Sequence, residues 1–189
     1  MCYGDLPGFG LSATGRRQAA EAAAYLGDFG ADLLLTSPLR RAVETAEVIG
    51  RRLGLPALPD DRLTEWRLGA RWNGVVWEDL SAAFPGELEA YLDHPDDLPF
   101  SPESLEAAAR RIADLVHELG ERQRGAAAVL VSHQDPVQAA RLLLTGGDLA
   151  ALHRDKPGHA AVLTLSPGDP WRETGRWEPA ATGVRFPPV

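Results

Sequence analysis

The sequence contains a single cysteine and a single lysine among its 189 residues. Cys2 has no partner for an internal disulfide, which fits a reducing compartment. No apolar run approaches the ~18–20 residues of a membrane-spanning helix. The first ten residues also lack the basic and apolar regions of a signal peptide. We therefore expect a cytoplasmic protein with no membrane partner.

Positive charge is scarce, and almost all of it is arginine. The formal net charge is −8, which disfavours a large nucleic-acid surface, so we predict no nucleic-acid partner. Lys156 is the one lysine. Any anion site is therefore expected to consist of arginine, histidine and backbone amides.

Short apolar runs alternate with segments of helical spacing. Strands are predicted at 33–35, 126–131, 160–165 and 171–177, and helices at 14–28, from Ser37-Pro38 to Leu53, from Ser101-Pro102-Glu103 to Gly125, and from Asp135-Pro136 onward. This alternation predicts an α/β fold of three layers, with a mostly parallel sheet and helices on both faces. The uninterrupted apolar run at 126–131 is typical of a strand covered on both sides.

Residues 66–100 break this alternation. Tryptophan, phenylalanine and tyrosine side chains occur there among proline, glycine and acidic residues. We interpret 66–100 as an insertion of short helices and loops that covers the pocket and sets the substrate. It does not read as a separate domain, so residues 1–189 are expected to form a single domain.

His133 ends a predicted buried strand immediately before a helix. Ligands of parallel α/β sheets bind beyond the carboxyl ends of the strands, and a helix N-terminus favours anions. Ser37 stands at a second such strand end. A structural histidine bonded to a loop is the alternative for His133. Asp135 is expected to cap the helix and so to point away from an anion site.

Three further side chains suit phosphate chemistry. Arg40 and Arg41 lie in the first turn of a predicted helix, where a bound anion would offset the unfavourable cation–dipole interaction. Glu65 precedes Trp66, and desolvation by the indole would suit the carboxyl group to donate a proton. The alternatives are two solvated arginines and a surface glutamate.

Five segments together resemble the histidine phosphatase superfamily, which has the phosphoglycerate-mutase-like fold. Residues 11–19 (LSATGRRQA) resemble its L-[ST]-x-x-G-x-x-Q-A segment, and 37–46 (SPLRRAVETA) its S-x-L-x-R-A-x-x-T-A segment. Residues 63–65 (LTE) resemble L-x-E, 103–111 resemble E-S-x(6)-R, and 132–133 (SH) resemble the Ser-His pair. Each motif alone is weak, but the order and spacing of all five match.

The resemblance implies a phosphomonoesterase that acts through a phosphohistidine. A histidine nitrogen attacks phosphorus, and water then releases phosphate. Arg41 and His133 would hold the phosphoryl oxygens, Glu65 would protonate the leaving alkoxide, and Arg40 would lie at the rim. No metal and no cofactor are implied. The expected partner is a small phosphorylated substrate or phosphate.

The family's nucleophile is not found in the sequence. The family carries it in an R-H-G or R-H-A motif that ends a first strand upstream of L-[ST]-x-x-G. Only ten residues precede Leu11, and none is histidine. One interpretation is that Met1 is an internal methionine just beyond that strand. The other is a pseudoenzyme that binds phosphorylated ligands without turnover.

Other functions stay open at this point. A phosphoglycerate-mutase-type phosphotransferase and a protein phosphohistidine phosphatase share the fold implied by the resemblance. From another class, the alternatives are a phospho-ligand sensor or an assembly partner, and a third is an α/β domain whose motif matches are coincidental. The oligomeric state cannot be predicted from the sequence.

Overall fold

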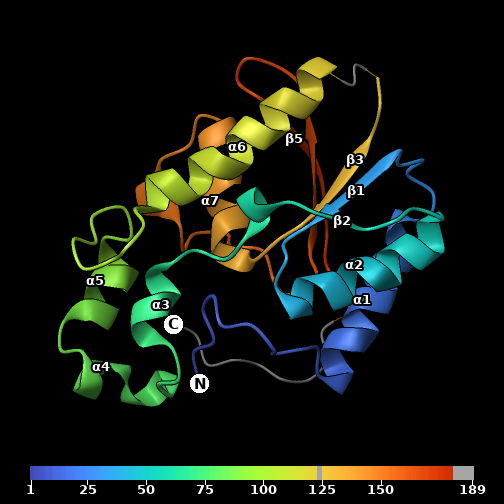
Figure 1. Cartoon of the computed structure of the whole chain (residues 1–189). Coiled ribbons are helices and arrows are strands. Elements are labelled where there is room, and N and C mark those ends of the chain that lie inside the picture. Colours follow the sequence, from blue (N-terminus) through green and yellow to red (C-terminus); the bar gives the residue numbers. More distant parts are fainter. Residues whose placement is uncertain (123–124, 181–189) are drawn as a thin grey trace.

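The computed structural model describes residues 1–122 and 125–180, and Figure 1 shows the arrangement of their elements. The strands are β1 (Leu33–Thr36), β2 (Leu58–Pro59), β3 (Ala128–Val131), β4 (Val162–Ser166) and β5 (Arg172–Trp177). The long helices are α1 (Ala13–Leu26), α2 (Arg40–Leu53), α6 (Leu105–Arg122) and α7 (Gln134–Leu144). The short helices are η1 (Asp61–Leu63), α3 (Leu68–Trp72), η2 (Trp77–Asp79), α4 (Leu80–Ala83), α5 (Glu87–Asp93) and η3 (Leu149–Ala151).

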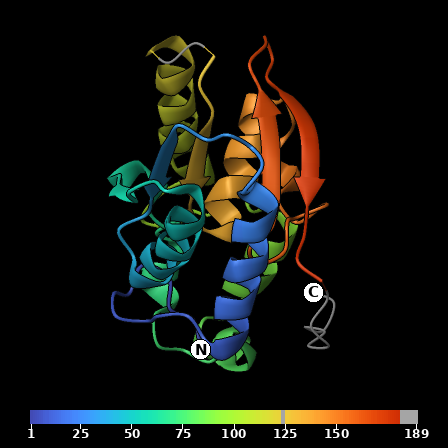
Figure 2. The same ribbon diagram turned by 90° about the vertical axis from the view of Figure 1, so that its right-hand side faces the viewer.

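A parallel sheet lies at the centre of the fold. Its strand order is β2-β1-β3, and β1 is parallel to both neighbours. Strands β4 and β5 form a separate antiparallel pair, visible as the two orange and red arrows in Figure 2. The predicted α/β class with a mostly parallel sheet is confirmed.

Alternate side chains of the sheet face two different helical layers. Leu34 packs with residues of α1 and α2, and Val129 joins the same cluster. Leu35 and Leu130 instead pack with Ile112 of α6 and with α7. Successive residues of a strand point to opposite faces, so this division places one pair of helices on each side of the sheet. The predicted three layers are therefore present.

Strand β3 differs from its prediction. The apolar run at 126–131 predicts a strand between two neighbours, but in the part of the chain that the structure describes β3 pairs with β1 alone. Its residues are only partly buried or exposed. The composition is that of an interior strand, whereas the position is an edge of the three-stranded sheet.

Helices α2 and α6 begin later than predicted. Ser37 Oγ accepts a hydrogen bond from Leu39 N at 3.2 Å, and the helix starts only at Arg40. Ser104, rather than Ser101, stands before α6, and its Oγ accepts the backbone N–H three residues on at 3.1 Å. In both places the serine–proline pair forms a turn before the helix instead of its first residues.

Residues 66–100 form short helices and loops, as predicted. Their buried aromatic side chains include Trp66, Trp72 and Tyr91, which pack in one cluster with Leu105 and Ala109 of α6. The segment is therefore packed against α6, which lies with α7 on one face of the sheet.

Gly50 allows α2 to lie close to the chain that follows it. A Cβ at this position would come 2.5 Å from Leu55 O and 3.2 Å from Leu34 Cδ2. Alanine normally stabilises a helix relative to glycine by ~1 kcal/mol. Here we expect Gly50→Ala to lower the free energy of unfolding by about 2 kcal/mol, because a carbonyl cannot move away cheaply.

Urea unfolding followed by circular dichroism measures this difference. Gly120→Ala in α6 is the matched control, since its added Cβ would meet only the Trp171 ring, at 3.3 Å, and a side chain can move. Equal losses of stability in the two variants would contradict the steric explanation.

Candidate active site

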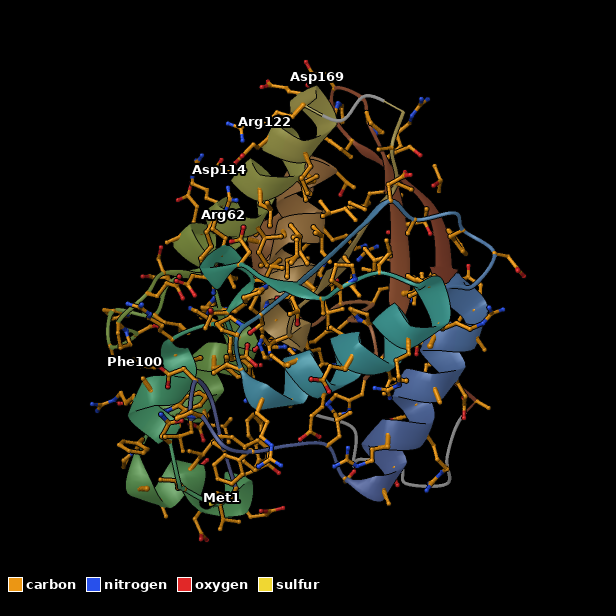
Figure 3. All side chains as sticks on the ribbon, turned by 45° about the vertical axis from the view of Figure 1, so that its right-hand side comes forward. Met1, Arg62, Phe100, Asp114, Arg122 and Asp169 are labelled. Carbon is orange, nitrogen blue, oxygen red and sulfur yellow. The ribbon has the colours of Figure 1, made fainter. Side chains whose placement is uncertain are left out.

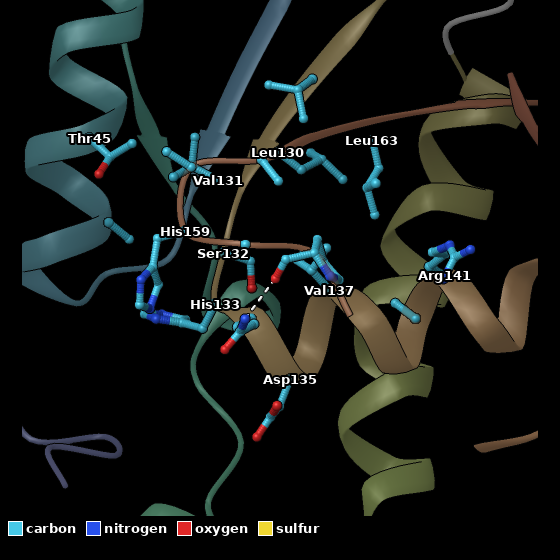
Figure 4. Close-up of a pocket in the computed structure, with 18 of the residues that line it drawn as sticks. Thr45, Leu130, Val131, Ser132, His133, Asp135, Val137, Arg141, His159 and Leu163 are labelled. Carbon is cyan, nitrogen blue, oxygen red and sulfur yellow. Dashed lines mark hydrogen bonds between the residues drawn. The ribbon is translucent and has the colours of Figure 1, made fainter. Parts of the chain in front are cut away.

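A cavity of about 3020 Å³ opens at the carboxyl end of β3 and extends along that strand toward β4. Arg41, Glu65 and His133 all line it. Figure 4 shows His133 and Asp135 at the start of α7, and Leu130, Val131 and Leu163 farther along the strands. The part of the cavity next to His133 and Asp135 is therefore polar, and the part between β3 and β4 is apolar.

Three of the four predicted site residues converge on one point. Arg41 Nη2 lies 3.5 Å from Glu65 Oε2, and His133 Nδ1 lies 3.6 Å from the same oxygen. The three residues come from the start of α2, the segment after η1 and the end of β3. A cation, a carboxyl group and an imidazole thus meet in space, although they lie up to 92 residues apart in sequence (133 − 41).

Arg40 does not join this group. Its Nε donates to Glu44 Oε1 at 2.7 Å, and its Nη1 donates to Gly8 O at 3.2 Å. The side chain is largely exposed and is not among the residues that line the cavity. Its role at the rim stays a prediction.

A hydrogen bond between two strand ends orients His133. Its Nε2 lies 2.8 Å from Ser37 Oγ. Because Ser37 Oγ already accepts the N–H of Leu39, its hydroxyl hydrogen is available to donate to Nε2. We infer that the neutral ring then carries its proton on Nδ1, the nitrogen that faces Glu65.

His133 is neutral at pH 7. Burial, together with the positive charges of Arg41 and Arg111, lowers its pKa to about 3. The preceding residue is fixed as well, since Ser132 Oγ donates to Leu63 O at 2.7 Å. His133 can therefore donate one N–H to an anion without bearing a charge itself.

Glu65 titrates near neutrality. Burial, with a smaller contribution from the negative charge of Asp135, raises its pKa to about 7 against the opposing effects of the Trp66 N–H, Arg41 and Lys156. Its Oε1 accepts the Trp66 N–H at 2.9 Å. A carboxyl group that is about half protonated at pH 7 is suited to donate a proton to a leaving group.

Arg111 fixes the backbone that carries Glu65. It donates to Arg62 O at 2.6 Å and to Glu65 O at 3.1 Å, and it forms an ion pair with Glu103 at 2.9 Å. Trp66 Nε1 in turn donates to Glu103 O at 2.8 Å. The sequence motif includes Glu103 and Arg111 but predicts no role for them. In the structure, the two residues hold the backbone around Glu65 in position.

The start of the chain also lines the cavity and contacts Arg41. Arg41 Nη2 donates to Gly4 O at 2.6 Å. Cys2 exchanges backbone hydrogen bonds with Gly74 and Val75, which brings the start of the chain next to the short helices. In Figure 3, Met1 lies at the opposite end of the molecule from Asp169. A bound phosphate would compete with the Gly4 carbonyl for the guanidinium.

Asp135 does not cap α7, contrary to the prediction. The N-cap residue is His133, with no side-chain cap bond, and Asp135 lies in the first turn. Its carboxylate instead forms an ion pair with Lys156 and accepts a hydrogen bond from Tyr91 OH at 3.0 Å. These partners are distant in sequence, so local capping rules could not identify them.

Two further histidines, His153 and His159, also line the cavity. His153 Nε2 lies 2.8 Å from Tyr91 O, and its ring packs edge-on against the Tyr91 ring. His159 lies in the loop before β4 and is drawn in Figure 4. Within the described residues, no group of three or more His, Cys, Asp or Glu side chains is arranged to hold a metal ion.

Comparisons with known proteins give the family. The model of the histidine phosphatase superfamily (branch 1) matches residues 2–178. A glucosyl-3-phosphoglycerate phosphatase of Mycolicibacterium vanbaalenii is 39% identical over 143 residues, 72% of this chain and 63% of the relative. A phosphoserine phosphatase 1 of Hydrogenobacter thermophilus is 30% identical over 141 residues, 74% of this chain and 66% of the relative.

The solved structures agree. A mycobacterial glucosyl-3-phosphoglycerate phosphatase in complex with VO3 aligns with a TM-score of 0.81 at 31% identity, covering 94% of this chain and 90% of that one. The chain belongs to the histidine phosphatase superfamily. It spans about two thirds of the length of the two curated relatives named above. No helix among the described residues is long and apolar enough to cross a membrane.

The titration of Glu65 predicts pH-dependent anion binding. Below pH 7 the carboxyl group is protonated and leaves Arg41 available, whereas above pH 7 its charge repels an anion and pairs with Arg41. We expect the affinity for sulfate, which stays dianionic, to fall about tenfold from pH 6 to pH 8, following the protonated fraction of Glu65. Isothermal titration calorimetry measures it.

Glu65→Gln is the matched variant, because the amide keeps the shape and removes the charge. We expect its sulfate affinity to be nearly constant over this range, since His133 is neutral throughout. A slope unchanged by Glu65→Gln would show that another group is responsible.

Proposed function

We propose that this site hydrolyses monophosphate esters of small molecules through a phosphohistidine intermediate. The observation that supports this most is the convergence of Arg41, Glu65 and His133 at one end of the cavity. Family membership and the names of the relatives favour a phosphatase over a mutase or an inactive binding protein.

In the proposed mechanism, the two phosphate ligands act through charge and hydrogen bonds. The Arg41 guanidinium and the His133 Nδ1–H hold the phosphoryl oxygens while a histidine nitrogen attacks phosphorus and the ester P–O bond breaks. Glu65 in its protonated form gives its proton to the departing alkoxide. Glu65, now ionised, then takes a proton from the water that attacks phosphohistidine, which releases phosphate and restores both residues.

The attacking histidine is the unassigned part of this mechanism. His133 is occupied as a ligand in the proposal, and its Nε2 is bonded to Ser37. We propose that the nucleophile belongs to an extended segment bound along the outer edge of β3, between β3 and β4. A segment parallel to β3 would end at the same edge as Ser37 and His133, because the carboxyl ends of parallel strands meet there.

The apolar part of the cavity is compatible with such a segment. Leu130 and Val131 on one side and Leu163 on the other line it. An added strand gains affinity from main-chain hydrogen bonds to an exposed strand edge and specificity from side-chain contacts. For the described residues, β3 has no partner on that edge.

The substrate is proposed to be a small phosphorylated metabolite. Relatives are named as phosphatases of glucosyl-3-phosphoglycerate and of phosphoserine, which are phosphate esters of small polar alcohols. The net charge of −8 disfavours a polyanionic substrate such as a polyphosphorylated inositol.

Neighbouring arginines test the phosphate site. We expect Arg41→Ala to weaken binding of inorganic phosphate at least thirtyfold, because a charge-assisted contact worth ~2 kcal/mol or more is lost. Arg40→Ala should change it by less than about threefold, since Arg40 is exposed and paired with Glu44. Calorimetric titration compares them. Equal effects, or no effect of Arg41→Ala, would contradict the proposed site.

Complementation in trans tests the nucleophile. The 189-residue chain alone should hydrolyse p-nitrophenyl phosphate no faster than buffer. Adding a peptide of about six apolar β-branched residues followed by Arg-His-Gly should produce measurable release of p-nitrophenol. The same peptide with alanine in place of histidine should bind equally well, by tryptophan fluorescence, without turnover.

Two outcomes would change the proposal. Turnover by the chain alone that His133→Ala or His159→Ala abolishes would place the nucleophile within the described residues. Binding of phosphate and of the histidine peptide without any turnover would favour the inactive phospho-ligand-binding alternative.

A further inference from the structure

Glu65 lies on a segment that belongs to no helix or strand. It follows the short helix η1 and precedes α3. Side chains from other elements bind the main-chain carbonyls of this segment. Arg111 of α6 donates to Arg62 O at 2.6 Å and to Glu65 O at 3.1 Å. Ser132 Oγ donates to Leu63 O at 2.7 Å, so two side chains hold the backbone that carries the Glu65 carboxyl group.

Ser132 differs from Arg111 in what it connects to this segment. Arg111 belongs to α6, whereas Ser132 directly precedes His133 at the carboxyl end of β3. Among the described residues, the bond from Ser132 to Leu63 is the hydrogen bond that joins residues 60–65 to residues 128–133. It therefore lies two residues from the Glu65 carboxyl group on one side and one residue from the imidazole on the other.

The direction of the Ser132 side chain follows from β3. Successive residues of a strand point to opposite faces, and Ser132 comes two residues after Leu130. Leu130 packs in a cluster with Leu63 and with Ile112 of α6, so Ser132 is directed toward the same cluster. Leu63 is fully buried there. Its carbonyl is shielded from water, and loss of the hydroxyl would leave it without a replacement donor.

We propose that Ser132 is a positioning residue whose hydroxyl holds Glu65 within reach of Arg41 and His133. This inference rests on the proposed function, because it assigns the group that places the proton donor beside the two phosphate ligands. The hydroxyl hydrogen of Ser132 is bound to Leu63 O. Ser132 therefore acts through the segment of Glu65 and not on the phosphoryl group, although it lines the cavity.

Loss of the hydroxyl changes the titration of Glu65 in one direction. Burial is the largest cause of its raised pKa, which is about 7. Arg41 and His133 lie within 3.6 Å of its carboxyl oxygen, and Asp135 and Lys156 act on it through their charges. A substitution at position 132 removes none of these groups. A segment released from β3 would admit water to the carboxyl group, so the pKa of Glu65 would fall toward its ordinary value.

Sulfate binding by Ser132→Ala at two pH values tests the inference. Calorimetric titration of the full chain should give an affinity about fivefold weaker than that of the wild type at pH 7 and nearly unchanged at pH 5, as a fall of about one unit in the Glu65 pKa requires. Such a fall removes most of the protonated carboxyl group at pH 7 but little of it at pH 5. A general loss of the anion site would instead weaken binding equally at both pH values.

Further variants control the experiment, and thermal unfolding confirms that each is folded. Ser132→Thr keeps the hydroxyl and should keep the wild-type affinity at pH 7, whereas Ser132→Cys, a weaker donor of similar size, should lower it as alanine does. Thr145→Ala removes a hydroxyl that donates to Arg141 O at 2.8 Å outside the cavity lining, and it should change neither value. In the Glu65→Gln background, Ser132→Ala should change the affinity by less than about twofold, because the group that it positions is absent.

The outcomes separate the two proposals. If the wild-type chain binds sulfate but Ser132→Ala has no effect, or weakens binding equally at pH 5 and pH 7, the role of Ser132 is wrong and the phosphate site stands. The same conclusion follows if Ser132→Thr behaves like Ser132→Ala, or if the effect persists in the Glu65→Gln background. If the wild-type chain binds neither sulfate nor inorganic phosphate, the proposed function is wrong and the inference that rests on it is wrong as well.

Discussion

The hydrogen bond between Ser37 and His133 is the contact on which the site depends. It joins the carboxyl ends of β1 and β3 at 2.8 Å and fixes which nitrogen of His133 faces Glu65. Parallel pairing of the two strands places these residues at one edge of the sheet. Arg41 follows because α2 begins three residues after Ser37, so a short turn carries the guanidinium to the same point.

The electrostatic state of the site follows from that geometry and from burial. His133 is neutral because burial disfavours its charged form, and Glu65 is near half protonation for the same reason. Arg41 is thus paired with a carboxyl group that is only about half ionised at pH 7, whereas Lys156 is paired with the Asp135 carboxylate. A bound dianionic phosphate would pair with the Arg41 guanidinium. Its negative charge would also favour the protonated form of Glu65, because the two anions repel each other.

Sequence reasoning found the fold class and the three convergent residues, because each lies at a position set by local pattern. His133 ends an apolar run, and Arg41 and Glu65 fall in recognisable motifs. Sequence reasoning failed where partners distant in sequence determine what a side chain contacts. Asp135 satisfies a local capping rule, yet its side chain bonds to Tyr91 and Lys156, which lie 44 and 21 residues away in sequence (135 − 91 and 156 − 135). A charged partner in a buried site outweighs one backbone N–H.

The conflict at β3 has a different origin. Residues 126–131 are uniformly apolar, which suits a strand with neighbours on both edges, but the described chain provides a neighbour on one edge only. An edge of this composition leaves main-chain N–H and C=O groups and apolar side chains exposed, an arrangement that proteins usually avoid. The same edge lines the cavity that ends at His133. A segment bound there would cover the apolar side chains, pair with the β3 backbone and place its last residue at the phosphate site. The unpaired edge of β3 and the unassigned nucleophile of the mechanism would then be explained by the same segment.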